Sequence, residues 1–213
     1  IKQVEDARRT GIRSWEDVTT LPKDLREKLS EVVPLWTVTP DAVAESTDGT
    51  LKWRLRTHDG LAIESVLIKH ARGRRTLCVS SQAGCALGCK FCATGAMGPG
   101  RDLTTREIAD QAFLAADVAR EADARVSNVV FMGMGEPLQN YEATLAALRI
   151  MLSDHAYGLS RRRVTVSTSG VVPMIDRLRL DCPVALAVSL HAPNDDLRDQ
   201  LVPINRKYPI DEL

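Results

Sequence analysis

The sequence predicts an α/β fold whose core alternates parallel strands with helices, preceded by a small α+β region at the N-terminus. Short, mainly apolar runs such as 129–132 and 184–191 alternate with longer segments of helical period. This alternation is typical of parallel strands that helices cover. Between about residues 40 and 70 the hydrophobic period is two, and an Asp-Gly pair interrupts it, which indicates an antiparallel hairpin.

Length and composition set the limits of the prediction. The 213 residues suffice for one large or two small domains, and the 44% hydrophobic content can build a core. The formal net charge is zero, so any contact with nucleic acid has to come from a local patch. No apolar run approaches the roughly 20 residues of a membrane span. Both ends have the pattern of cut segments, and we expect a fragment of a longer protein.

We expect residues 1–70 to form the N-terminal accessory region. Its first part has a helical pattern, with helix starts near Ser14 and Pro22. Two strands over 51–56 and 61–68 follow and form the hairpin around the Asp-Gly turn.

Glu64 stands out in the second strand of this hairpin. Its side chain shares a face with Ala62, Val66 and Ile68. A carboxylate on a mostly apolar face is costly unless it is paired or functional, and burial would raise its pKa toward that of a base. The alternative is a glutamate that points to water.

A basic loop over 70–75 contains three arginines and marks the predicted domain boundary. It is a candidate contact for phosphates, although most such loops are merely solvated. We expect the second domain to comprise residues 71–213.

The second domain is expected to repeat a strand, turn and helix unit. The predicted strands cover 76–80, 129–132, 163–167 and 184–191. Thr104 and Glu107 form a capping box that opens the first long helix. Further helices are expected around Leu145 to Leu152 and after Pro173.

Three cysteines follow the first of these strands. Cys85, Cys89 and Cys92 have the spacing C-x3-C-x2-C. Thiolates hold iron–sulfur clusters, and three ligands on a four-iron cluster leave one iron open for a small molecule. A zinc site usually has four protein ligands in paired C-x2-C units, and a disulfide would leave one thiol over. The odd number of five cysteines and the lack of a signal peptide favour a reducing, cytoplasmic location.

Polar or glycine-bearing segments follow all four predicted strands. The cysteines follow the first strand, Gly133–Glu136 the second, Ser167 the third, and Ser189–His191 the fourth. Ligands of parallel sheets bind at the carboxyl ends of the strands, so we expect these segments to meet at one ligand site.

In this order the motifs resemble those of the RlmN/Cfr family of radical S-adenosylmethionine (SAM) methyltransferases. They are the cysteine triplet, Gly133–Pro137, Val164–Gly170 and Ser189–Ala192. The resemblance runs from about Trp53 to Leu213 and implies a partial (β/α) radical SAM barrel. It also implies methylation at C2 of adenine in 23S rRNA and tRNA.

The resemblance implies a role for each matched residue. A [4Fe-4S] cluster would be held by Cys85, Cys89 and Cys92. S-adenosyl-L-methionine would be bound by Gly135, Glu136, Ser167, Ser189, Leu190 and His191. Glu64 matches the family's proton acceptor, and Cys78 matches a cysteine that helps resolve a protein–RNA crosslink. A small buried strand residue is the other interpretation of Cys78, and Cys182 is expected to be structural.

The family's reaction implies a further cysteine. One SAM methylates a cysteine near the C-terminus, and the cluster, reduced by a donor such as flavodoxin, cleaves a second SAM to a radical. We expect the methyl-carrying cysteine to lie beyond residue 213. The chain alone would then bind the cluster and SAM without methylating RNA, and its sheet would have an unpaired edge after the fourth strand.

Two other functions remain open at this stage. One is the C8-adenine methylation of the Cfr branch, and the other is a non-catalytic metal-binding RNA module. We expect a monomer that does not associate with membranes.

Overall fold

The computed structural model describes residue 7 and residues 11–213. The part of the predicted N-terminal helical region that falls on 1–6 and 8–10 lies outside the described residues. Among the described helices, none has the length and apolar character needed to cross a membrane.

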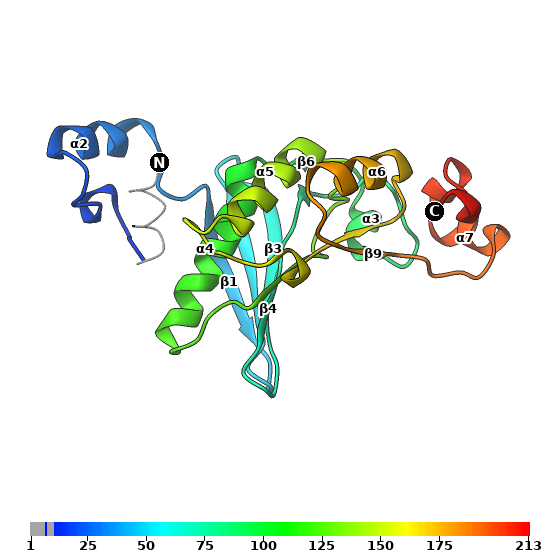
Figure 1. Ribbon diagram of the computed structural model, residues 1–213, viewed down its shortest axis with the longest axis horizontal. Helices are drawn as coiled ribbons and strands as arrows, with labels where there is room; N and C mark the ends of the chain where they lie inside the picture. The colour runs from blue at the N-terminus through cyan, green and yellow to red at the C-terminus, as the bar shows by residue number, and fades with distance from the viewer. Residues whose placement is uncertain (1–6, 8–10) are drawn as a thin grey trace.

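A seven-stranded mixed sheet forms the centre of the molecule (Figure 1). In spatial order its strands are β1 (Val38–Glu45), β2 (Leu51–Thr57), β3 (Ala62–Lys69), β4 (Arg75–Cys78), β7 (Asn128–Phe131), β8 (Val164–Thr168) and β9 (Ala185–Val188). The pairs from β1 to β4 are antiparallel, and those from β4 through β7 and β8 to β9 are parallel. The α/β fold with a parallel core is therefore confirmed. Two short strands, β5 (Gln82–Ala83) and β6 (Arg101–Asp102), form a second sheet.

The helices follow the predicted order. They are η1 (Trp15–Asp17), α2 (Lys23–Val32), α3 (Ala93–Met97), α4 (Thr105–Glu121), α5 (Tyr141–Leu152), η2 (Arg161–Arg163), α6 (Val172–Asp181), α7 (Asp195–Leu201), η3 (Pro203–Arg206) and η4 (Ile210–Glu212). The capping box of α4 is present, because the Glu107 N–H donates to Thr104 Oγ1 and the Thr104 N–H donates to the Glu107 carboxylate. The sequence did not predict α7.

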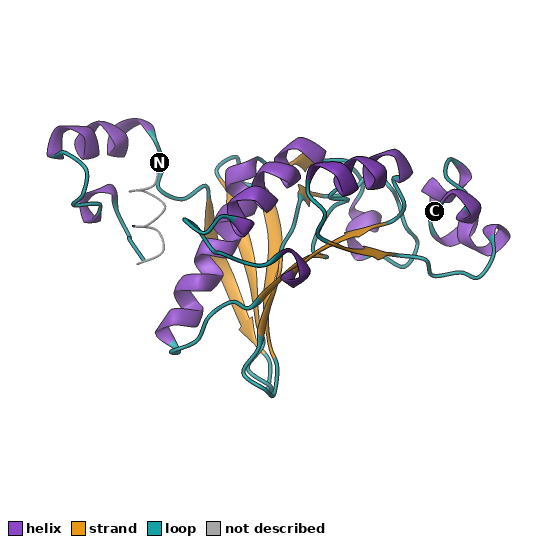
Figure 2. Cartoon of the chain, in the orientation of Figure 1, coloured by secondary structure: helices purple, strands orange, loops and turns teal. Residues whose placement is uncertain are grey.

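The two faces of the sheet differ in burial. Residues such as Leu77, Phe131 and Val166 point to one face and are buried in the main core. Helices α4, α5 and α6 lie over that face (Figure 2). The residues between them, such as Cys78 and Ser167, point to the other face and are partly exposed. The sheet therefore has a covered face and an open face.

The sheet continues across the predicted domain boundary near residue 70, because β3 pairs with β4. The helical part of the accessory region has a small core of its own, built on Ile12, Trp15, Val18 and Leu35. At the other side, β9 is an edge strand whose Leu186 and Val188 are 41% and 37% exposed. The expected open edge after the fourth strand is thus present in the described part of the chain.

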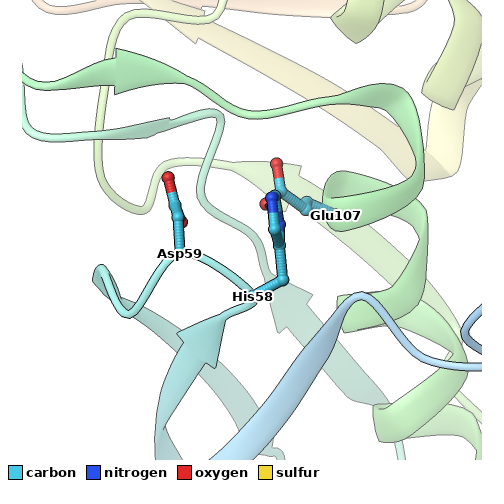
Figure 3. A group of neighbouring side chains, drawn as sticks. All are labelled: His58, Asp59 and Glu107. Carbon is cyan, nitrogen blue, oxygen red and sulfur yellow. Dashed lines mark ion pairs between the residues drawn. The ribbon is translucent and has the colours of Figure 1, made fainter.

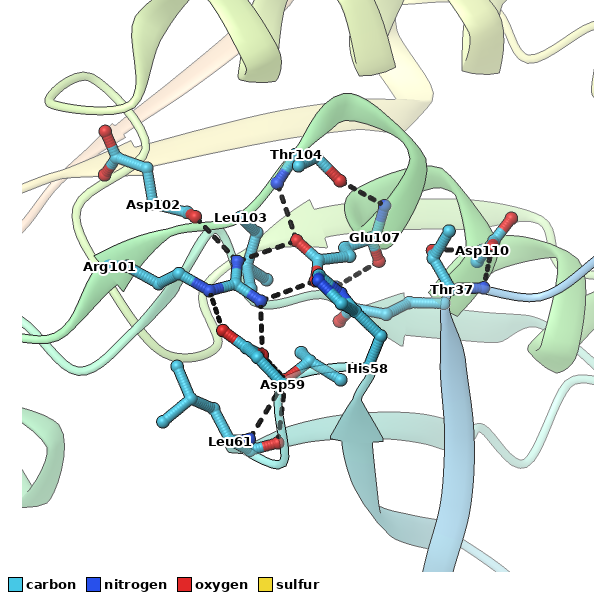
Figure 4. Close-up of polar contacts among 12 residues, drawn as sticks. Thr37, His58, Asp59, Leu61, Arg101, Asp102, Leu103, Thr104, Glu107 and Asp110 are labelled. Atoms are coloured by element: carbon cyan, nitrogen blue, oxygen red, sulfur yellow. Dashed lines mark hydrogen bonds and ion pairs between the residues drawn. The ribbon is translucent and has the colours of Figure 1, made fainter. Parts of the chain in front are cut away.

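A cluster of charged residues joins the hairpin to the core. His58 and Asp59 of the β2–β3 turn lie beside Glu107 of α4 (Figure 3), with ligand atoms within 4.8 Å of one another. Arg101 of β6 already occupies both carboxylates, with Nη2 2.7 Å from an oxygen of Asp59 and 2.7 Å from an oxygen of Glu107 (Figure 4). A guanidinium in this position competes with a metal ion, so the group is an ion-pair network that fixes the hairpin tip.

Substitution of Arg101 tests this network. We expect Arg101→Met to lower the free energy of unfolding by about 2 kcal/mol, because Glu107 is 1% exposed and would lose its partner. The exposed Lys23→Met, whose pair with Glu27 lies on the surface of α2, should change it by less than about 0.5 kcal/mol. Urea denaturation measures both, and equal small losses would contradict the assignment.

The same network predicts a dependence of stability on pH. Burial opposes ionisation of Glu107, but hydrogen bonds from Arg101 and Thr104 outweigh it and hold its pKa below the usual 4.5. Hydrogen bonds from Arg101 and Thr57 lower the pKa of Asp59 below 3.8. A lowered pKa in the folded state stabilises the fold above the unfolded-state pKa, and this contribution is lost as the pH falls below it. The stability difference between wild type and Arg101→Met should therefore shrink below about pH 4 in acid titrations followed by circular dichroism.

Candidate functional site

A pocket of about 280 Å³ lies at the carboxyl ends of the parallel strands. Its lining comes from the cysteine loop and from the segments after β7, β8 and β9. The lining residues are Cys85, Cys89, Phe91, Cys92, Gly95, Phe131, Met132, Gly133, Gly135, Glu136, Ser167, Thr168, Ser169 and Ser189. The predicted meeting of the four strand ends at one site is therefore present in the structure.

The three cysteines of the pocket are free thiols that line one cavity. Cys89 Sγ lies 3.7 Å from Ser169 Oγ. Within the described chain the three sulfur atoms do not all lie within 4.8 Å of one another. A single zinc ion with bonds of about 2.3 Å would need them closer, whereas a cube of four irons places one iron under each sulfur. The donor set thus fits a cluster better than a zinc ion.

The environment of two of these thiols, Cys85 and Cys89, favours their protonated form. Burial raises the pKa of Cys85 and of Cys89, and the nearby Glu136 carboxylate adds to both shifts. Coordination to a metal deprotonates a thiol outright, so a bound cluster would hold these cysteines as thiolates.

Close backbone approaches shape the loop that carries the cysteines. The Cys85 N–H donates to the Gly98 carbonyl, and the Lys90 N–H donates to the Leu201 carbonyl at the end of α7. A Cβ atom on Gly100 would lie 1.5 Å from the Ala83 carbonyl oxygen. Only glycine permits this contact, which folds the loop back on itself.

The Gly133–Glu136 loop is fixed against the segment that leads to the cysteines. The N–H groups of Ser81 and Gln82 donate to the Met134 carbonyl, and the Met134 N–H donates to Ser80 Oγ. A Cβ on Gly135, whose φ is +97°, would lie 2.5 Å from Gln82 Cβ. The loop therefore needs glycine for both its conformation and its contact.

Glu136 is the acidic residue of the pocket lining and is 3% exposed. Its carboxylate accepts hydrogen bonds from the Ser169 N–H at 2.8 Å and the Leu138 N–H at 3.0 Å. Burial raises its pKa, and these two hydrogen bonds oppose the shift. The group is thus a desolvated acid, held in one orientation, beside the thiols.

Cys78 and Glu64 lie on the open face of the sheet next to the pocket. The register pairs Cys78 with Val66 and Val130. Burial raises the pKa of Cys78, and a hydrogen bond that its sulfur accepts from the Met132 backbone opposes this. Glu64 is not buried, whereas the interpretation of a base with a raised pKa required burial. Its side chain is 47% exposed and pairs with Lys52 Nζ at 2.7 Å. Its carbonyl nevertheless accepts from Ser80 Oγ, which also contacts the glycine loop.

The fourth predicted segment lies only partly at the pocket. Strand β9 ends at Val188, so Ser189, Leu190 and His191 form a loop instead of continuing the strand. Ser189 lines the pocket. His191 has a φ of +57°, and its ring lies 3.8 Å from that of Phe91, while Leu190 is 45% exposed. His191 therefore supports the pocket through Phe91.

Arg198 of α7 is a site residue that the sequence did not reveal. Its guanidinium is fully buried and donates to the carbonyls of Ser169, Ser189 and Leu190 at 2.8, 3.3 and 3.1 Å. It also donates to Asn205 Oδ1 at 2.6 Å. The arginine thereby joins the ends of β8 and β9. A charged residue in a short polar helix carries no periodic signal, so only the packing identifies it.

The fold and the pocket together define the class: a parallel-sheet protein with a cluster-binding cysteine loop at the ligand edge. The family model of the radical SAM superfamily matches residues 79–213. The chain therefore belongs to the radical SAM superfamily, and this membership implies a [4Fe-4S] cluster and S-adenosylmethionine.

A solved structure is similar over the whole chain. It is the crystal structure of a radical SAM methyltransferase from Sphaerobacter thermophilus, with 51% sequence identity and a TM-score of 0.95. The match covers 100% of this chain and 63% of that one. This chain thus spans less than two thirds of the length of its relative.

Replacement of Arg198 tests its place at the site. Arg198→Met would leave one buried and three part-buried acceptors without their donor, and we expect a loss of about 3 kcal/mol in the free energy of unfolding. Backbone amides of residues 189–192 should also exchange faster with solvent. Arg206→Met, at an exposed position in η3, is the matched control and should leave both measurements unchanged. Unaltered exchange in Arg198→Met would show that the arginine does not hold the strand ends.

Proposed function

We propose that this chain is the cluster- and SAM-binding part of a radical SAM methyltransferase that acts on C2 of adenine in 23S rRNA and tRNA. The observation that carries the proposal is that one pocket is lined by three free thiols, the Gly133–Glu136 loop and three serines of the strand ends. The methyltransferase named above, at 51% identity, supports the reaction class. The ordered motifs of the RlmN/Cfr family support the substrate.

The protein groups of the pocket bind and orient the reactants. Cys85, Cys89 and Cys92 would hold the cluster, which together with SAM supplies a 5′-deoxyadenosyl radical when an electron donor such as flavodoxin reduces it. Glu136 presents a carboxylate in a water-poor site, which suits the ammonium group of the methionine part of SAM. The glycine backbone beside it permits close approach of the ligand.

The open face of the sheet would receive the adenine. C2 of adenine is electron-poor and its hydrogen is not acidic, so transfer of a methyl cation has no nucleophile there. A carbon radical can add to this position. To restore the aromatic ring, the adduct would then lose one electron, for which the oxidised cluster could be the acceptor, and its ring proton, which a base would remove. Glu64 lies on this face, and Lys52 at 2.7 Å holds its carboxylate in place. Cys78 lies on the same face, and this position supports a role for it in release of the product.

Anaerobic reconstitution with iron and sulfide tests the first half of the proposal. After reduction and addition of SAM, the wild-type chain should release 5′-deoxyadenosine, measured by liquid chromatography. Cys89→Ser should abolish both the brown chromophore and the product. Cys182→Ser is the matched control, because Cys182 is a buried core residue that does not line the pocket. Bound zinc without a chromophore would instead support a metal-binding RNA module.

Methylation itself is tested in the full-length protein. We expect mass spectrometry of digested rRNA and tRNA to find the methyl group on C2 of adenine. Glu64→Gln should reduce the rate at least 100-fold, the scale expected for a lost general base, while 5′-deoxyadenosine formation continues. Glu45→Gln, at an exposed position in β1, should leave the rate unchanged. A methyl group on C8 would assign the protein to the Cfr branch.

A further inference from the structure

A second hollow lies at the amino ends of the parallel strands, whereas the pocket lies at their carboxyl ends. Three loops form it, each leading into a parallel strand: the loops before β4, β7 and β8. Its volume is about 760 Å³, and a neighbouring hollow of about 320 Å³ shares Arg125 and Arg163 with it. We call the two together the arginine groove. The arginines that line it are Arg72, Arg74, Arg75, Arg125, Arg162 and Arg163.

The arginines of the groove lack acidic partners. Among the described residues, none of the six takes part in an ion pair. Asp123 is the acidic residue of the lining. The Nε atom of Arg75 is buried and has no hydrogen-bond partner in the described structure. Since the chain as a whole has zero net charge, this concentration leaves the rest of the chain net acidic.

The base of the groove is fixed by hydrogen bonds between two of its loops. The Ser127 N–H and Oγ both donate to the Arg75 carbonyl at 2.9 Å, and the Arg75 N–H donates to Ser127 Oγ at 3.1 Å. The loops lead into neighbouring strands about 5 Å apart, so the arginines follow one another across the sheet. Five of the six arginines are exposed on these loops, and such a cluster of guanidinium groups suits a ligand with several phosphates in succession.

The position of the groove distinguishes between anionic partners. The cluster pocket lies at the carboxyl ends of the strands, and the groove lies at their amino ends. Strand β8 alone separates Arg163 from Ser167 by about 13 Å, from the rise per residue. An electron donor has to approach the cluster and would not benefit from docking here. A large RNA can contact the carboxyl ends and the amino ends of the strands at once.

We propose that the arginine groove binds the phosphodiester backbone of the RNA substrate, away from the reacting adenine. This rests on the proposed action on RNA and adds a second contact surface to it. Arginine contacts to phosphates position a nucleic acid without reading its sequence. The groove therefore contributes affinity and orientation, while the pocket and the open face select the adenine.

The experiment measures binding of a fluorescein-labelled RNA stem-loop to the 213-residue chain by fluorescence anisotropy at several KCl concentrations. The test variant is Arg125→Gln/Arg163→Gln, and both side chains are exposed. The control is Arg177→Gln/Arg179→Gln on α6, which removes the same charge from another surface. Urea denaturation confirms that both variants fold.

We expect the test variant to bind about 10-fold more weakly at 0.1 M KCl. The slope of log K against log salt should fall by about 1.5, the effect of two lost phosphate contacts. The control variant should stay within about twofold of the wild type.

Three results would overturn the proposal, and they are distinguishable. Equal binding by test variant and wild type would reject the groove and leave the RNA substrate intact. No binding by any of the three proteins would also count against the RNA substrate. Displacement of the RNA by polyglutamate at equal charge concentration would show a general site for acidic polymers.

Discussion

The architecture of the site depends on the contact between the segment 80–82 and the loop that ends β7. Two N–H groups of this segment share the Met134 carbonyl, and Ser80 Oγ joins the loop to the backbone of Glu64. Side chains larger than hydrogen at Gly133 and Gly135 would collide with this segment. The contact brings the cysteine loop and the glycine loop to one pocket, and every other element of the site is placed relative to it.

Hydrogen bonds to backbone groups, rather than pairs of opposite charges, complete the pocket. Ser169 is the centre of this arrangement: its N–H donates to Glu136, its carbonyl accepts from Arg198, and its hydroxyl lies near Cys89. Buried charges are costly unless such partners surround them. Glu136 and Arg198 therefore sit on opposite sides of one strand end, each satisfied by the peptide groups of the other segments.

Charged residues of opposite sign lie at the two ends of the parallel strands. The pocket at the carboxyl ends contains a buried carboxylate and three thiols, and the groove at the amino ends contains six arginines. The Arg101 network stabilises the hairpin tip near α4, and the guanidinium already contacts both of its carboxylates. Although the net charge is zero, the charged residues are unevenly distributed. This distribution suits a small cationic cofactor at the carboxyl ends of the strands and a polyanion at their amino ends.

The sequence alone determined the parallel order of the core, the capped helix at Thr104 and the radical SAM superfamily, because periodicity, caps and short-range spacing are local properties. It also indicated the cysteines, Gly135, Glu136, Ser167 and Ser189 as neighbours, since strand ends in a parallel sheet share one edge. Only the tertiary structure decided the exposure of Glu64, the loop that replaces the end of β9, the buried Arg198 and the convergence of distant arginines. These features depend on which segments pack together across many residues of chain, and no local pattern encodes that choice.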